Sequence, residues 1–239
     1  MFSYTSHAND QTMTHDMSQH AGNGPSALER AAHTIDDQFT VRYRDTRGAP
    51  DYARAFNALG ALAGFGCQMA IREGFVKPGL LPESKAFVVL GTKDGRKYFF
   101  GDVINGCLFE GRQGQITVWA LVGGAAQKSG AKTLPNMGEI AGYNAKVLGS
   151  DQFGVPRVPE QYRSPELPID VVKQDWPAMQ KLLVDDKVDP RLWGWTFALA
   201  AQYMIVKSKD DFDPGMAATI VMETALPMSK IDPASVGVQ

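Results

Sequence analysis

The feature of this sequence that most constrains its fold is a long apolar helix, which we predict over residues 51–73. No charged residue occurs between positions 55 and 71. Asp51 can accept hydrogen bonds from free N–H groups of the first turn, and Gly74 can close the last turn in the left-handed conformation. Apolar or small residues recur every three or four positions along two faces: Phe56, Leu59, Leu62, Gly66 and Met69, and Gly60, Gly64, Cys67 and Ile71. A helix that is apolar nearly all round normally lies in the middle of a domain.

Two properties of this helix have alternative interpretations. A membrane span needs about 20 apolar residues. Asn57, Gln68 and three glycines interrupt the run, so we expect a buried helix instead. The stripe of small residues lets another backbone approach closely. We expect its neighbour to be a helix over residues 193–206, and the alternative is a two-fold dimer in which the stripe meets its own copy.

A β-hairpin is predicted over residues 86–101. Asp94 and Gly95 suit a two-residue type I′ turn, which requires positive φ at both positions. This turn places Gly91 opposite Tyr98 and leaves apolar side chains on both faces of the hairpin. A lone hairpin is marginally stable in water, so we expect helices or further strands to cover both faces.

The other elements are predicted mainly as helices. Cap residues indicate helix starts at Ser26, Asn136, Asp175, Asp189 and Asp213, the last three close to a proline. Residues 116–128 fit either a strand or a helix, and we predict a helix. Residues 38–44 are predicted as a possible third strand, because apolar and polar side chains alternate there.

Together these elements predict an α+β fold, a mostly helical single domain with a small antiparallel sheet packed on the central helix. The domain spans residues 26–239. Within it, residues 149–168 are rich in proline and form an extended crossing, either a functional loop or a plain linker, and residues 169–239 form a helical C-terminal part. Residues 1–25 are polar, lack Lys and Arg, and are expected to form a flexible tail.

Composition narrows the classes of function. The 239 residues carry a formal net charge of -2, which gives no electrostatic basis for binding nucleic acid or an anionic membrane. The first residues lack the basic and apolar regions of a secretory signal, so we expect a cytoplasmic protein. Cys67 and Cys107 are then expected to be buried core thiols in a reducing compartment.

The positions of the histidines and glycines exclude most catalytic, metal-binding and nucleotide-binding motifs. All four histidines lie at positions 7, 15, 20 and 33, so the main body of the chain lacks the imidazole that nucleophilic triads and many metal sites use. The glycines of residues 64–66 and 123–130 do not stand in the frame of a nucleotide-binding loop. We therefore expect no cofactor and no metal.

Carboxylates and amides are the remaining candidates for a ligand site. Glu223 lies in the middle of a predicted helix without an evident structural role, and Asp102, Asn105 and Gln202 lie next to apolar segments. The first hypothesis is a non-catalytic cytoplasmic protein that binds a protein partner or forms a homodimer. The alternative is an enzyme or sensor with a small-molecule pocket between the sheet and the C-terminal helices, lined by these four residues.

Overall fold

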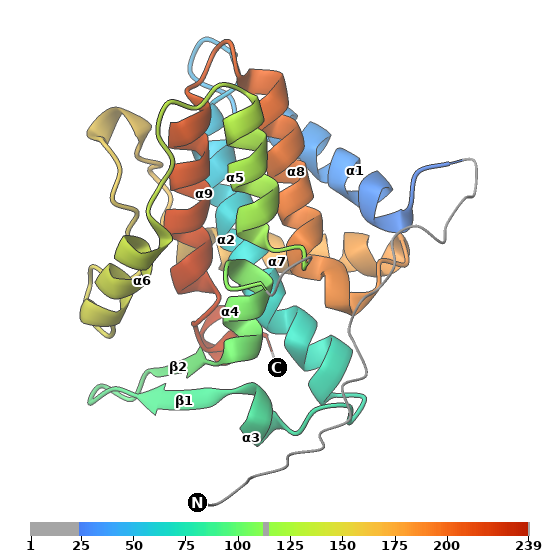
Figure 1. Cartoon of the computed structure of the whole chain (residues 1–239), viewed down its shortest axis with the longest axis vertical. Coiled ribbons are helices and arrows are strands. Elements are labelled where there is room, and N and C mark those ends of the chain that lie inside the picture. Colours follow the sequence, from blue (N-terminus) through green and yellow to red (C-terminus); the bar gives the residue numbers. More distant parts are fainter. Residues whose placement is uncertain (1–23, 112–114, 239) are drawn as a thin grey trace, which may run out of the picture.

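The computed structural model describes residues 24–111 and 115–238, and within these ranges the chain folds into nine α-helices and one β-hairpin (Figure 1). The predicted tail, residues 1–25, lies almost wholly outside them. The elements are α1 (Ala27–Arg42), α2 (Tyr52–Ile71), α3 (Glu83–Ala86), β1 (Val88–Gly91), β2 (Lys97–Phe100), α4 (Asp102–Leu108), α5 (Val118–Lys128), α6 (Met137–Lys146), α7 (Pro168–Asp185), α8 (Trp193–Ser208) and α9 (Pro214–Met228). A π-helical turn, Arg72–Val76, continues α2.

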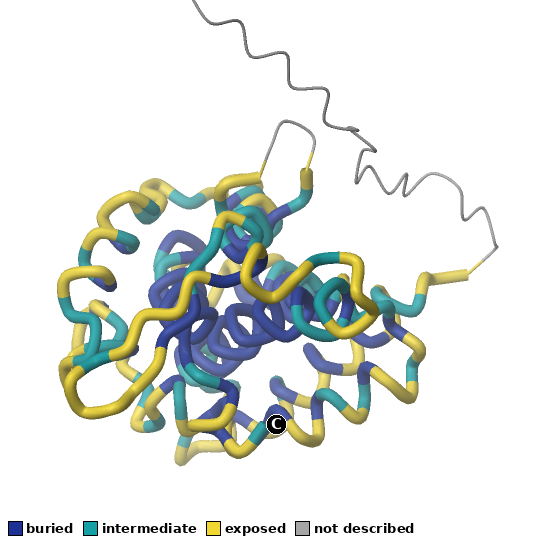
Figure 2. The backbone as a smooth tube through the Cα atoms, turned by 90° about the horizontal axis from the view of Figure 1, so that it is seen from below, coloured by how far each residue is buried: buried dark blue, intermediate teal, exposed yellow. Residues whose placement is uncertain are grey.

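Helix α2 is the centre of the molecule, as the sequence predicted. Every residue from 55 to 71 is buried. Helices α8 and α9 run alongside α2, α7 packs across it, and α5 packs on α8 and α9 in front of it (Figure 1). Figure 2 shows the result as a buried core ringed by exposed segments. Among the helices of the described ranges, none has both the length and the apolarity that crossing a bilayer requires.

The stripe of small residues on α2 is filled from within the chain. A Cβ atom added at Gly64 would lie 1.9 Å from the carbonyl oxygen of Ala225, and one added at Gly60 would lie 2.5 Å from that of Val221. Both carbonyls belong to α9. Helix α8, the expected neighbour, approaches only the end of the stripe, where Gly194 contacts Cys67. Because α9 occupies the groove, the stripe is not available to a second copy.

The hairpin forms where it was predicted, but its register differs by one residue. Leu90 pairs with Tyr98, and Gly91 pairs with Lys97. Thr92 N donates to the Arg96 carbonyl at 2.9 Å, which leaves a three-residue loop closed by Gly95 at φ 84°. The predicted pairing of Gly91 with Tyr98 is therefore wrong. A three-residue loop needs positive φ only at its last position, which Gly95 supplies.

The possible third strand is wrong, because residues 38–42 belong to α1. Only Arg44 forms an isolated β-bridge, with Pro50, and the described sheet contains two strands. The burial follows the helical spacing and not the strand alternation: Phe39 and Tyr43, four positions apart, are both buried, whereas Val41 between them is 64% exposed. Residues that alternate over five positions also include an i, i+4 pair, so the pattern did not separate strand from helix.

Most predicted helix starts are confirmed by their caps. Ser26 and Glu29 form the capping box of α1, Asn136 caps α6 and Asp213 caps α9. Residues 118–128 form the helix α5, which settles the alternative between strand and helix.

The helix start predicted at Asp175 is wrong, because α7 begins at Pro168 and continues through Pro177. A proline inside a helix removes a hydrogen bond. A buried stripe of α7 compensates for that loss: Val171, Val172, Trp176, Met179 and Leu183.

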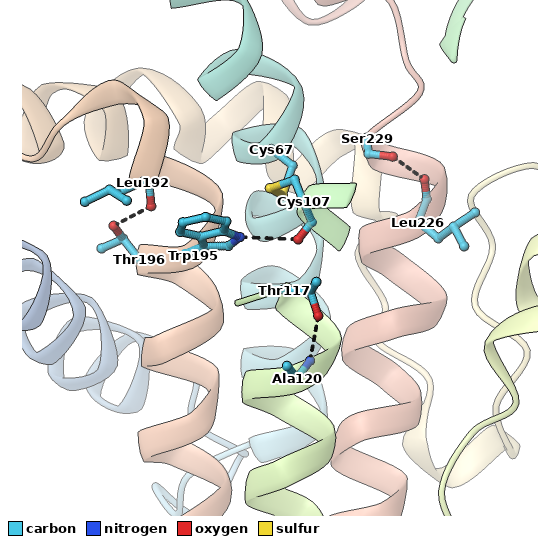
Figure 3. Close-up of a disulfide and its surroundings, with 9 residues drawn as sticks. All are labelled: Cys67, Cys107, Thr117, Ala120, Leu192, Trp195, Thr196, Leu226 and Ser229. Atoms are coloured by element: carbon cyan, nitrogen blue, oxygen red, sulfur yellow. Dashed lines mark hydrogen bonds between the residues drawn. A yellow bond between two sulfur atoms is a disulfide. The ribbon is translucent and has the colours of Figure 1, made fainter. Parts of the chain in front are cut away.

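The two cysteines form a disulfide, so the expectation of two free core thiols is wrong. Cys67 on α2 is joined to Cys107 on α4, with Cα atoms 6.0 Å apart. Cys67 is fully buried, as expected. Trp195 Nε1 donates to the Cys107 carbonyl at 3.3 Å (Figure 3). The disulfide and this hydrogen bond tie the short helix α4 to α2 and α8.

Candidate functional site

Three of the four predicted site residues do not form a common pocket: Asp102 and Asn105 share the short helix α4, and Gln202 lies on α8. Asp102 is exposed in the first turn of α4, and Gln202 is partly buried on α8. Asn105 accepts a hydrogen bond at 2.8 Å from Lys230 Nζ. None of the three lines either of the two clefts described below.

Glu223, the fourth, anchors the proline-rich crossing. Its carboxylate is 4% exposed and forms an ion pair with Arg157 at 2.6 Å. The Arg157 backbone N–H donates to the same carboxylate at 3.4 Å, and the guanidinium lies 4.3 Å from the ring centroid of Tyr143 on α6. These contacts give the buried Glu223 carboxylate a structural role, because they join α9, the crossing and α6.

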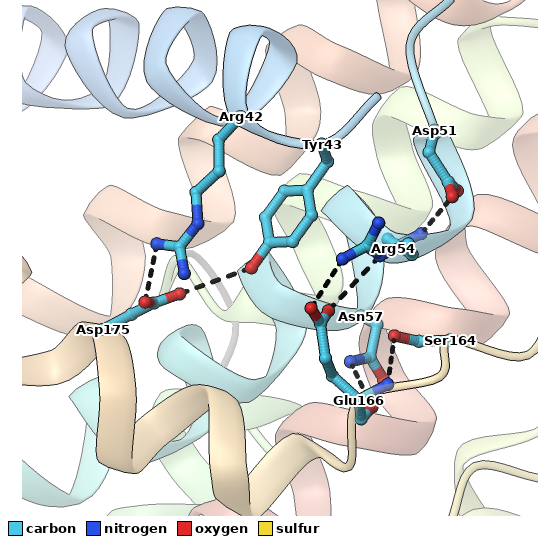
Figure 4. A network of polar contacts seen from close by, with 8 residues as sticks. All are labelled: Arg42, Tyr43, Asp51, Arg54, Asn57, Ser164, Glu166 and Asp175. Atoms are coloured by element: carbon cyan, nitrogen blue, oxygen red, sulfur yellow. Dashed lines mark hydrogen bonds and ion pairs between the residues drawn. The ribbon is translucent and has the colours of Figure 1, made fainter. Parts of the chain in front are cut away.

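A second polar network fixes the start of α2 (Figure 4). Asp175 on α7 pairs with Arg42 at 2.6 Å and accepts a hydrogen bond from the Tyr43 hydroxyl at 3.3 Å. Arg54 on α2 pairs with Glu166 of the crossing at 2.6 Å. Burial, reinforced by the Asp175 charge, raises the pKa of Tyr43, so the phenol stays protonated and acts as a donor. The network holds α1, α2, α7 and the crossing together.

Lys230, just beyond α9, is a buried cation that sequence reasoning missed. The residue is 3% exposed, and its ammonium lies 5.4 Å from the ring centroid of Phe100. Burial lowers the pKa of Lys230 to about 8, against the opposing effect of the Glu110 charge. Its carbonyl accepts a hydrogen bond from Phe99 N at 2.8 Å, so the same residue holds β2 against the end of α9.

The larger cleft, which we call the hairpin cleft, has a volume of about 450 Å³. It lies between the hairpin, residues 150–155, the start of α7 and residues 228–235. This is where the alternative hypothesis placed a small-molecule pocket, but other residues line it. Apolar side chains form much of the lining: Tyr98, Phe153, Leu167, Ile169, Met228 and Ile231.

A smaller cleft of about 230 Å³ lies at the end of α2, and we call it the Arg72 cleft. Arg72 contributes a guanidinium that lies against two aromatic rings, those of Phe87 and Phe99. Charged residues of both signs surround the opening: Glu73, Lys77 and Glu83. No described group of three or more His, Cys, Asp or Glu residues has a geometry that could hold a metal ion.

Strand β1 exposes apolar side chains to solvent. Val88, Val89 and Leu90 are 60%, 49% and 44% exposed. Strand β2 is covered on its other edge, where Phe99 N donates to the Lys230 carbonyl and Tyr98 bridges Ile231. The free edge of β1 has no strand partner among the described residues. The sequence-based expectation that both faces of the hairpin are covered is therefore wrong for β1.

The β1 edge is flanked by positive charge. Lys85 precedes the strand and Lys93 follows it; both are exposed and neither forms an ion pair with a described residue. The nearby carboxylates are already engaged, because Glu83 pairs with Arg72 and Asp94 pairs with Arg96. Lysines around an edge strand discourage indiscriminate strand pairing, and this signal was present in the sequence.

Comparison of the chain with protein-family models, with curated proteins and with solved structures found no match.

Proposed function

We propose that this protein acts by non-catalytic binding of an extended polypeptide segment, which adds as a strand to the free edge of β1. The observation that carries the proposal is the exposure of three consecutive aliphatic residues on a strand with one free edge, Val88, Val89 and Leu90. In strand addition, main-chain hydrogen bonds supply affinity and alternate side chains supply specificity.

The hairpin register determines which backbone amides of β1 are free to bind an added strand. Hydrogen-bonded and non-hydrogen-bonded pairs alternate along an antiparallel ladder. Thr92 N donates to the Arg96 carbonyl, so the amides of Leu90 and Val88 also face β2. The amides of Val89 and Gly91 then face outward, where an added strand accepts from them.

The positive charge beside β1 favours a partner with negative charge. With Lys85 and Lys93 unpaired at the two ends of β1, an added segment gains from acidic residues that flank its apolar core. Two copies pairing antiparallel through β1 would bring Lys85 of one chain near Lys93 of the other, and like charges across strands are destabilising. The proposed partner is therefore a different polypeptide with acidic flanks, and a homodimer through β1 is the alternative outcome.

A matched pair of proline substitutions tests strand addition. Proline at position 89 removes an outward amide and spares the hairpin ladder, whereas proline at position 90 removes an amide that faces β2. The probes are short synthetic peptides with alternating Val and Thr and with either Asp/Glu or Lys/Arg flanks. We expect the acidic-flanked peptides to bind the native protein and not Val89→Pro. Equal binding by Val89→Pro, or no binding by any peptide of the set, overturns the proposal.

Charge reversal tests the identity of the partner. Lys85→Glu with Lys93→Glu should weaken binding of the acidic-flanked peptides, and Lys128→Glu with Lys132→Glu, exposed lysines elsewhere, should not. Light scattering of the native protein and of Val89→Pro tests for the homodimer. If the native protein is dimeric and Val89→Pro is monomeric, β1 pairs with its copy instead.

The hairpin cleft favours a second candidate function, binding of a small molecule. Its volume falls within the usual range of ligand pockets, about 300–1,000 Å³, and its lining combines apolar side chains with a charged rim. Small-molecule fragments that bind there should shift the methyl NMR signals of Leu167 and Ile169. Leu167→Glu should abolish the shift of the Ile169 signal, and its persistence would place the binding elsewhere.

The disulfide bears on the compartment in which this function operates. Disulfides persist in oxidising environments and are rare in the cytosol. The cytoplasmic location expected from the sequence stays a prediction, and the Cys67–Cys107 bond favours an oxidising compartment over it. Producing cells are denatured with acid and treated with a thiol reagent, which reaches buried cysteines too; a cytosolic protein would then label at both cysteines, and an oxidised one at neither.

A further inference from the structure

The π-helical turn at the end of α2 places one arginine in an unusual setting. Arg72 begins the turn Arg72–Val76, in which Lys77 N donates to the Arg72 carbonyl five residues earlier. π-helical turns are rare and often occur at functional sites. The guanidinium carbon of Arg72 lies 4.6 Å from the ring centroid of Phe87 and 4.4 Å from that of Phe99. The two rings are in edge-to-face contact with each other, with centroids 5.7 Å apart, so they contact the guanidinium together on the side that faces the hairpin.

The hydrogen bonds of this guanidinium are incomplete. Nη1 donates to Glu83 Oε1 at 3.2 Å. Nε and Nη2 are buried, and neither has an acceptor among the residues that the structure describes. These two nitrogens share one edge of the guanidinium, and that edge binds carboxylates and phosphates through two parallel hydrogen bonds. Burial lowers the pKa of Arg72, as expected for a cation whose partners compensate its desolvation incompletely.

The Arg72 cleft lies beside this arginine. Its 230 Å³ are lined by four apolar residues and four charged ones: Met69, Val76, Pro233, Val238, Arg72, Glu73, Lys77 and Glu83. Glu83, on the four-residue helix α3, is the loosely held member of the rim, because its side chain is 60% exposed. An ion pair that exposed contributes little to stability, so Glu83 can move aside and admit an anion at little cost.

We propose that Arg72 anchors a binding site for an oxyanion group, a carboxylate or a phosphate of a small molecule, which enters through the Arg72 cleft as the Glu83 side chain moves aside and binds the edge formed by Nε and Nη2. The site is separate from the β1 edge and does not depend on the strand-addition proposal. Arginine is required rather than lysine, because only a guanidinium offers a planar edge with two donors.

The probes are inorganic phosphate and malonate, each titrated at millimolar concentrations into the full chain. The readout is the ¹⁵N–Hε NMR signal of Arg72, assigned by its loss in Arg72→Lys. We expect saturable shifts of this signal with at least one anion, and the preferred anion identifies the ligand as phosphate or carboxylate. Arg72→Lys should bind that anion at least about tenfold more weakly by calorimetry. Arg47→Lys, which alters an exposed arginine, should bind it as the native chain does.

Two results overturn the inference: no shift of the Arg72 signal with either anion, or equal affinity in Arg72→Lys. If Arg72→Lys does not fold, Glu83→Gln decides the matter. Removing the competing carboxylate should tighten anion binding several-fold, and an unchanged affinity contradicts the displacement of Glu83.

Discussion

Replacement of Gly64 by alanine tests the close contact between α2 and α9. The added Cβ would meet the Ala225 carbonyl oxygen at 1.9 Å and its Cα at 2.7 Å. An ordinary contact begins near 3.4 Å, so the two helices would have to separate by about 1.5 Å, the difference between 3.4 and 1.9 Å. The obstructing atoms are backbone, and no side-chain rotation relieves the clash.

The size of the effect follows from this geometry. Overpacking a core costs about 1–3 kcal/mol and sometimes more. Because the clash involves two rigid helices, we expect Gly64→Ala to cost at least about 3 kcal/mol, the top of the range given for overpacked cores. For a chain of this size that loss lowers the melting temperature by about 6–12 °C, at about 2–4 °C per kcal/mol.

Gly142→Ala is the matched control. Gly142 lies inside α6, and nothing lies within 4 Å of its added Cβ. The same substitution there should stabilise the protein by about 0.5–1 kcal/mol, because alanine loses less conformational entropy in a helix. Calorimetry and urea unfolding of both variants measure the difference. If Gly64→Ala unfolds at the temperature of the native protein or above it, α9 does not occupy the groove of α2.

Three further predictions concern buried charges and the disulfide. Lys230 has a lower pKa folded, about 8, than unfolded, about 10.5, so the unfolded chain binds more protons between these values. The free energy of unfolding should therefore rise with pH across that window, by up to about 3 kcal/mol, and Lys230→Met should abolish this contribution in urea titrations. Reduction of the Cys67–Cys107 disulfide, which closes a loop of 40 residues, should cost about 2–4 kcal/mol, and neither cysteine should label before reduction. Glu223→Gln should cost about 1–3 kcal/mol and expose the crossing around Arg157 to proteolysis; an unchanged cleavage rate would contradict the anchor.

Elements with local signals were predictable from the sequence. The caps at Ser26, Asp51 and Asn136 act within three residues of the helix start, so the sequence alone contains the whole interaction. The burial of α2 was equally predictable, because the absence of charge over residues 55–71 leaves few other places for such a helix.

Features that depend on distant segments were not predictable. Cys67 and Cys107 are separated by 40 residues, and the pairing follows only from how α4 docks on α2. The hairpin register depended on whether Gly95 was the second or the third loop residue, and the dipeptide Asp94-Gly95 fits both.

The candidate sites could not be predicted either, because they also depend on contacts between distant segments. Arg72 became a candidate only when two rings from the hairpin were placed against it. Glu223 attracted attention as a carboxylate on an apolar helix, and its partner Arg157 lies 66 positions away. A single sequence names the charged residue but not its counter-charge, so buried ion pairs and ligand sites look alike at that level.

The most direct test of the strand-addition proposal is amide hydrogen exchange at the edge of β1, with and without an acidic-flanked peptide. In the free protein we expect the outward amides of Val89 and Gly91 to exchange fast and those of Val88 and Leu90 to be protected by β2. Peptide binding should slow Val89 and Gly91 specifically. If the peptide binds while these two amides keep exchanging at their free rates, the polypeptide does not add to β1 and the proposed function is wrong.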